Sequence, residues 1–318
     1  MRTKLYMIAL AAISMMLGSC SDSNSEFSQD YLADTPIKLN VSVDEPTTRA
    51  GYSDADKPTG FVLEVVNHNA DKYNYLVWAK KVGDSWKTYK PDETLKGGTD
   101  EEVTMLWANM NDKVDVTAFT NIGTITIPTD QTSDDQLKEA DVLYMPFTKY
   151  TPTNKGITVN LQHAMSKINL TIELGSEYEF SEEDVDLKIT DVKIDGSSVS
   201  GDLASGGIYD VSGDPTPISP YRTGTTPYSK TNGVITKASA TYEAILIPQT
   251  IASGNFTVSF KVDGKLYEWA YNQELTLAST TAYTLKLIAG DDKVQPVSFS
   301  VAAWKAGNGE NGEKKETD

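Results

Sequence analysis

Side chains that could bind a metal or attack a substrate are scarce in this sequence. The two histidines, His68 and His163, lie far apart, and no paired cysteines or His-x-x-x-His spacing suggests a zinc site. The chain also lacks a nucleophile elbow, a glycine-rich phosphate loop and a dinucleotide-binding fingerprint. We therefore expect no enzymatic activity, no cofactor and no metal, and we interpret His163 as a structural residue.

Carboxylates gather in two stretches and leave two alternatives open. The stretches hold Asp54 and Asp56, and Glu179, Glu182, Glu183, Asp184 and Asp186. Calcium prefers such oxygen ligands, but neither stretch has the glycine and final glutamate of a calcium-binding loop, so solvated acidic loops are the favoured interpretation. Two carboxylates could also serve a glycosidase, which the sequence cannot exclude.

The single cysteine, Cys20, has a context that predicts lipid attachment. It follows the apolar run Leu5–Leu17 and the small residues Gly18 and Ser19, and Arg2 and Lys4 precede the run. The run has the length of a signal peptide and is short for a membrane-spanning helix. The pattern resembles a bacterial lipobox, in which the thiol takes a diacylglycerol and the cysteine becomes the mature N-terminus. An ordinary secretory signal with an incidental cysteine is the alternative.

Arg49 stands alone in a stretch that a protease could cut. Residues 44–60 are rich in Pro, Gly, Asp and Thr, which is typical of an exposed loop. Exposed loops of small and polar residues are frequent sites of proteolysis. The bond between Arg49 and Ala50 is therefore a candidate cleavage site, although a loop arginine without a role fits the composition as well.

The elements that must position these residues are predicted to be strands. Ile37, Leu39, Val41 and Val43 alternate with polar residues, which predicts a half-buried strand over 37–43. Similar patterns recur along the chain, with hairpin turns expected at Gly83-Asp84 and Asp263-Gly264 and a bulge between Ile189 and Val192. Residues 134–145 suggest one or two helical turns, and residues 197–237 suggest long loops with short strands at most.

The last predicted strand lies close to the C-terminus. Val297, Phe299 and Val301 alternate with polar residues, and Trp304 follows them. The expected organisation is a signal peptide (1–19), a polar tether (20–36), an N-terminal β-sandwich domain (37–155), a C-terminal β-sandwich domain (156–307) that ends in the strand 297–304, and a tail (308–318).

The charge of the chain argues against nucleic acid as a partner. It contains 28 basic and 45 acidic residues, a formal net charge of −17. Binding to phosphates needs a positive surface, which such a chain does not provide.

The order of these features resembles the fimbrillin family of Bacteroidales. The resemblance rests on the lipobox, the strand before Arg49, the segments "LQHAMSKINLTIEL", "ATYEAILIPQ" and "TAYTLKL", and the terminal strand that ends in Trp304. It covers the chain from Cys20 to about Gly307. It implies two transthyretin-like β-sandwich domains in tandem. It also implies export as a lipoprotein to the outer membrane and cleavage by an arginine-specific protease. The C-terminal strand of another subunit then replaces the first strand, and the product is an extracellular fimbrium.

Carried over to this sequence, the resemblance assigns roles to four places. Cys20 would carry the lipid, and the cut would fall between Arg49 and Ala50. The displaced strand would present Ile37, Leu39, Val41 and Val43, and the donor strand would present Val297, Phe299, Val301 and Trp304. The expected partners are other fimbrial subunits, the outer membrane and the protease. The alternatives are an anchor or accessory subunit that keeps its lipid, and a surface lipoprotein that binds glycans through Tyr52, Trp86 and Tyr89.

Overall fold

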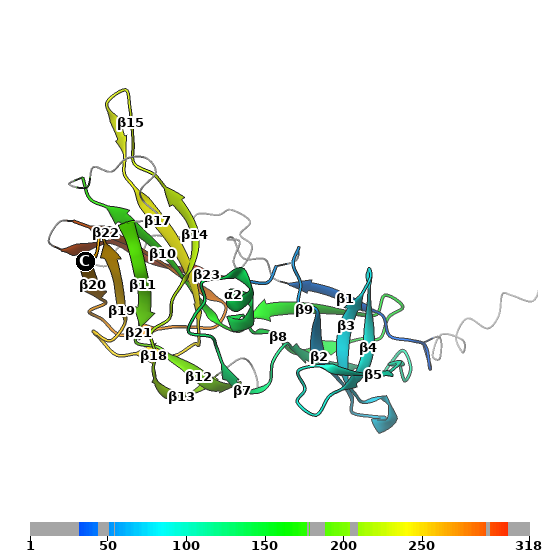
Figure 1. The fold of residues 1–318 in the computed structure, drawn as a ribbon. Helices are drawn as coiled ribbons and strands as arrows, with labels where there is room; N and C mark the ends of the chain where they lie inside the picture. The colour runs from blue at the N-terminus through cyan, green and yellow to red at the C-terminus, as the bar shows by residue number, and fades with distance from the viewer. Residues whose placement is uncertain are drawn as a thin grey trace, which may run out of the picture.

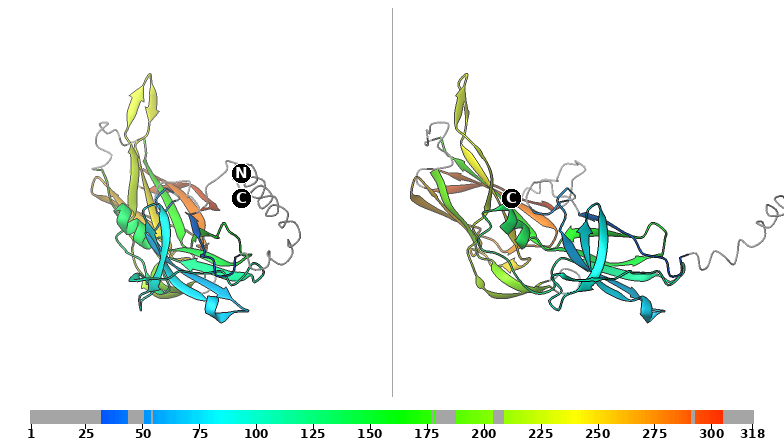
Figure 2. Two further views of the ribbon diagram at one scale, coloured as in Figure 1. Left: turned by 90° about the vertical axis from the view of Figure 1, so that its right-hand side faces the viewer. Right: turned by 45° about the vertical axis from the view of Figure 1, so that its right-hand side comes forward.

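The computed structural model describes residues 32–43, 51–53, 55–176, 178, 188–203, 209–290 and 293–304. This part of the chain is almost entirely β-structure, with the short helices η1 (Asp71–Tyr73) and α2 (Asp134–Ala140). The molecule is elongated, with one group of sheets at each end and α2 between them (Figures 1 and 2). The prediction of an all-β fold is confirmed.

One end of the molecule is an eight-stranded sheet. In spatial order its strands are β1 (Leu39–Val43), β9 (Ile157–His163), β8 (Leu143–Tyr150), β6 (Val114–Phe119), β2 (Gly60–Asn67), β3 (Tyr75–Val82), β4 (Ser85–Pro91) and β5 (Gly98–Glu102). Neighbouring strands are antiparallel except for β1 and β9, which run parallel. Alternate residues such as Val114, Val116 and Ala118 face one core. The sheet curls around this core until β1 lies against β4.

The other end is built on a five-stranded sheet. In spatial order its strands are β14 (Tyr221–Thr226), β17 (Ser239–Leu246), β10 (Ser166–Leu174), β22 (Thr281–Ala289) and β23 (Val294–Ala303). A three-stranded sheet of β11 (Ile189–Asp195), β19 (Thr257–Val262) and β20 (Lys265–Ala270) shares a second hydrophobic core with it. The predicted bulge in β11 is confirmed, because its register shifts between Thr190 and Lys193.

Smaller sheets complete this end. They are formed by β7 (Gly123–Thr126) with β12 (Ser198–Leu203) and β13 (Tyr209–Pro215), by β15 (Ser229–Thr231) with β16 (Val234–Thr236), and by β18 (Thr250–Ile251) with β21 (Leu275–Thr276). Residues 197–237 therefore carry more strand than predicted. These strands contain few large apolar residues and are held by backbone pairing, which leaves a weak hydrophobic pattern in the sequence.

The two ends are interlocked. Ile125, Ile127 and Leu137 belong to the second core, although β6 before them and β8 after them lie in the eight-stranded sheet. The chain thus passes between the ends after Phe119, again before Leu143, and again after His163. Backbone hydrogen bonds join these passages, from Thr120 N to Leu143 O (2.9 Å) and from Ala164 N to Val142 O (2.8 Å).

The change of sheet therefore falls later than the expected domain boundary at residue 155. Strand β9 follows that boundary, yet it pairs with β1 and β8 in the eight-stranded sheet. The switch to the second sheet takes place between His163 and Ser166, where β9 ends and β10 begins. Alternating apolar residues run through both strands, so the sequence pattern hides the change.

Candidate functional site

The first predicted exchange strand, β1, lies at the edge of the eight-stranded sheet. It pairs with β9 from Leu39↔Ile157 to Val43↔Leu161. Val43 is buried, and Ile37, Leu39 and Val41 pack half-buried against the same core. The predicted alternation of 37–43 is therefore present, although the hydrogen-bonded strand is limited to 39–43.

The residues before β1 are also hydrogen-bonded to the rest of the domain. Ile37 N donates to Met105 O (2.9 Å), and Trp107 N donates to Thr35 O (3.0 Å). At the other side Gly156 has φ +82°, and a Cβ there would lie 2.1 Å from Lys38 O. Only glycine permits that close approach. Removal of β1 must therefore break contacts with β9 and with residues 105–107.

The second predicted exchange strand, β23, lies at the edge of the five-stranded sheet. Among the described strands, it pairs only with β22, in antiparallel orientation. Val297 and Val301 expose 51% and 58% of their surface, whereas Phe299 packs against Tyr271 and Tyr283 and Val294 packs against the second core. An edge strand with exposed apolar side chains is a surface that can pair with another chain.

Trp304 behaves differently from the rest of this predicted donor strand. It is 2% exposed, and its backbone N–H donates to Thr280 O (2.6 Å). Its indole stacks on the His163 ring, with ring centroids 4.0 Å apart and an angle of 7° between the planes. The end of the C-terminal strand is therefore fixed at the junction between the two cores.

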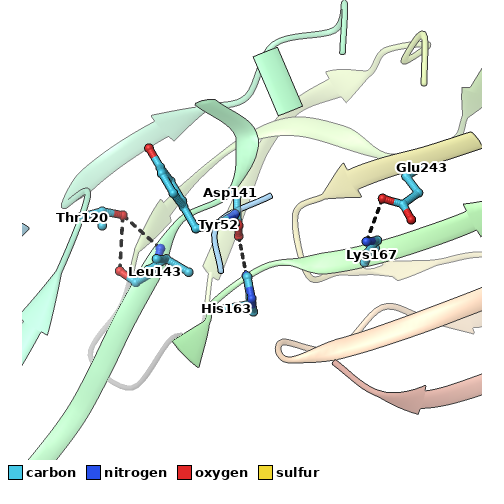
Figure 3. Close-up of polar contacts among 7 residues, drawn as sticks. All are labelled: Tyr52, Thr120, Asp141, Leu143, His163, Lys167 and Glu243. Atoms are coloured by element: carbon cyan, nitrogen blue, oxygen red, sulfur yellow. Dashed lines mark hydrogen bonds and ion pairs between the residues drawn. The ribbon is translucent and has the colours of Figure 1, made fainter. Parts of the chain in front are cut away.

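A buried polar cluster holds that junction together (Figure 3). His163 Nδ1 lies 2.8 Å from Asp141 Oδ1, and both side chains are fully buried. The other oxygen, Asp141 Oδ2, accepts a hydrogen bond from Tyr52 N (2.9 Å). Burial raises the pKa of Tyr52, and the Asp141 charge raises it further. His163 is thus a structural residue in this fold, as the sequence suggested.

A second buried pair lies beside it. Lys167 Nζ is 2.8 Å from Glu243 Oε2. Burial lowers the pKa of Lys167, although the Glu243 charge acts in the opposite direction. The ammonium also lies 5.6 Å from the centre of the Trp304 ring, within the range of a cation–π contact.

The segment after the candidate cleavage loop has a further anchor. Asp56 lies 2.5 Å from Lys138 Nζ on α2, and Asp134 lies 2.6 Å from the same atom. These hydrogen bonds raise the pKa of Lys138. Ser133 caps this helix through a reciprocal contact with Gln136. The aspartate that we weighed as a calcium ligand therefore faces a lysine.

Several predicted site residues lie outside the described residues. They are Cys20, Arg49, Ala50, Asp54, Glu179, Glu182, Glu183, Asp184 and Asp186. Within the described ranges, no group of three or more His, Cys, Asp or Glu side chains is arranged to hold a metal ion. No helix in those ranges is long and apolar enough to span a membrane.

The three aromatic residues proposed for glycan binding do not form one surface. Tyr52 lies beside Asp141, and Trp86 packs against Phe61 (5.1 Å between ring centroids). Tyr89 lines a cavity of about 360 Å³ together with Trp78, Lys80 and Asp100. Trp78 was not predicted.

The comparisons place this geometry among known proteins. A family model described as fimbrillin-like matches residues 61–304. A candidate cell adhesion protein from Bacteroides ovatus has a similar structure, with a TM-score of 0.58, 16% identity, and coverage of 87% of this chain and 100% of its own. A second candidate cell adhesion protein, from Bacteroides uniformis, has a TM-score of 0.55, 15% identity, and coverage of 85% and 98%. No curated protein matches the chain.

Proposed function

This chain belongs to the fimbrillin-like family, and we propose that it is a structural, non-enzymatic subunit of cell-surface fimbriae that polymerises by strand exchange. The observation that carries the proposal is the placement of the two exchange strands. Both β1 and β23 are edge strands with alternating apolar residues, and each pairs with one neighbour among the strands that the structure describes. A strand at an edge can be exchanged without opening the rest of its sheet.

The side chains of the two strands support the exchange. Departure of β1 would expose the edge of β9 and the core positions that Val43 and its neighbours cover. Val297 and Val301 of another subunit are already half exposed and could enter that groove, where main-chain hydrogen bonds would supply affinity. Such a contact is head-to-tail and does not close on itself, so it builds a filament.

The proposal includes the route to the cell surface. Cys20 would carry the lipid that anchors the precursor in the outer membrane, and an arginine-specific protease would cut between Arg49 and Ala50. Tyr52 N is hydrogen-bonded to Asp141, and Asp56 forms an ion pair with Lys138. These contacts would keep the chain from Gly51 onward in place after a cut that frees β1.

Treatment of the purified chain with an arginine-specific protease tests this function. We expect loss of the segment that contains β1, followed by a ladder of polymers that lengthens with protein concentration. Arg49→Gln should prevent both steps, and a chain that lacks residues 294–318 should be cut but should not polymerise with its own kind. A stable monomer after complete cleavage at Arg49 would contradict the proposal.

Two observations on cells separate a stalk subunit from an anchor or accessory subunit. A stalk subunit should be recovered from sheared fimbriae as a chain that begins at Ala50. An anchor should remain in the membrane fraction with its lipid and β1.

The cavity beside Trp78 favours saccharide binding as a second candidate function. Trp78 and Tyr89 are cross-strand neighbours, and a lysine, a carboxylate and threonine hydroxyls surround them. Aromatic faces with a few polar groups are suited to sugar rings. Titration with neutral oligosaccharides, followed by tryptophan fluorescence, should show binding that Trp78→Ala removes. Phe147→Ala changes an aromatic residue that is 62% exposed elsewhere on the sheet, so it should have no effect.

A further inference from the structure

The segment after the candidate cut and the end of the C-terminal strand meet at one buried pair. We propose that Asp141 and His163 couple these two segments, so that loosening residues 51–53 also loosens β23. In the proposed strand exchange, this coupling would link the segment after the cut to β23. Only the biological meaning of the coupling rests on the proposed function. Three contacts carry it: Tyr52 with Asp141, Asp141 with His163, and His163 with Trp304.

The first contact depends on a glycine. Gly51 is buried with φ +91°, and a Cβ at this position would lie 2.6 Å from Asp141 Oδ2. Any larger residue would be strained by that backbone conformation and would push the chain away from the carboxylate. Gly51 therefore lets Tyr52 N reach Asp141 Oδ2.

The second contact sets the position of the imidazole. Because the same carboxylate receives Tyr52 N on one oxygen and faces His163 Nδ1 with the other, a displacement of Asp141 acts on both partners. A carboxylate at one ring nitrogen fixes the orientation of a histidine. The fully buried ring has little room to compensate, since packed interiors respond to shifts as a unit.

The third contact is the main buried attachment of the end of β23. Residues Ser300–Ala303 are exposed, whereas Trp304 is buried on the His163 ring. Its indole N–H has no hydrogen-bond acceptor among the described residues, so stacking and packing hold the side chain. A shift of the imidazole therefore removes the surface on which Trp304 rests.

Hydrogen–deuterium exchange on the intact, uncleaved chain tests the coupling. Gly51→Ala should displace Tyr52 from Asp141 and raise the exchange rate of β23 amides by about 5- to 30-fold, the range for a perturbation of ordinary size. Gly83→Ala is the matched control, because Gly83 also has positive φ (+60°) but has no atom within 4 Å of the added Cβ. Its effect should stay within the hairpin between β3 and β4.

The reverse experiment uses the other end of the chain of contacts. Trp304→Ala should raise the exchange rate around Tyr52 as well as in β23, and the effects of Gly51→Ala and Trp304→Ala together should be less than the product of the two. If Gly51→Ala does not fold, Asp141→Asn, which keeps the size of the side chain, replaces it. An unchanged exchange rate in β23 overturns the proposal. Because no cleavage or assembly is involved, that result is independent of whether the chain polymerises.

Discussion

Lys167 shows how the setting of a single residue can reverse its expected exposure. In β10 it shares a side of the strand with Asn169, Thr171 and Glu173, which the alternation assigns to solvent. The junction covers this side at Lys167, and Glu243 on β17 supplies the opposite charge. The sequence pattern cannot reveal such burial, because the covering residues come from distant segments.

Replacing Lys167 should destabilise the fold strongly. Lys167→Met leaves the carboxylate of Glu243 buried without its partner, which typically costs about 3–5 kcal/mol. Lys167→Met combined with Glu243→Leu should recover most of that loss, since no charge remains buried. Urea unfolding measures both effects. Lys90→Met, which removes one side of an exposed pair with Glu101, should change the unfolding midpoint little. Equal loss in the single and double variants would argue against the charge explanation.

Glu173 gives the chain a defined sensitivity to acid. Burial raises the pKa of this carboxyl group, but hydrogen bonds from Lys286 (2.7 Å) and Lys237 (3.1 Å) outweigh it and hold the pKa below its ordinary value of 4.5. As the pH falls, the unfolded chain therefore binds a proton at Glu173 before the folded chain does. The stabilisation that Glu173 provides is complete above pH 4.5, and it is lost as the pH falls below 4.5 through the lower pKa of the folded state.

Comparison of Glu173→Gln with the unchanged chain isolates this contribution. The two should differ in urea midpoint near neutral pH, and the difference should shrink as the pH falls below 4.5. Glu102→Gln alters an exposed pair with Lys87 and should change the urea midpoint little. A difference for Glu173→Gln that stays constant with pH would exclude the ion pairs as its cause.

The strands that face a hydrophobic core were predicted well from the sequence. The alternation in β1, the turns of two hairpins and the bulge in β11 follow from side-chain periodicity and turn chemistry. Strand partners were not predictable, because β1 pairs with β9 across more than a hundred residues and runs parallel to it. The role of Asp141 was hidden for the same reason, since its partners lie on two distant segments.

The two strands proposed for exchange, β1 and β23, should respond differently to the same substitution. Val43→Ala removes a side chain that is 3% exposed and should lower the free energy of unfolding by about 2 kcal/mol. Val301→Ala removes one that is 58% exposed and should change it by a small fraction of that. Chemical denaturation of the uncleaved monomer makes the comparison. Equal losses would mean that β23 is covered in solution, for example by another copy of the chain.

The whole molecule depends on the segment that passes between its ends. Residues 164–318 expressed alone would lack Ile125, Ile127 and Leu137, which fill the second core. We expect this fragment to show no cooperative unfolding and to bind hydrophobic dyes. Addition of residues 121–142 in the same chain through a flexible linker should restore a sharp transition. A well-folded fragment without them would contradict the interlocked arrangement.

The three passages of chain between the two ends also have a mechanical consequence. Tension applied along the elongated molecule is divided among three covalent connections that lie side by side, tied by the Thr120–Leu143 and Val142–Ala164 hydrogen bonds. The two ends should therefore separate at a higher force than tandem units joined by one linker.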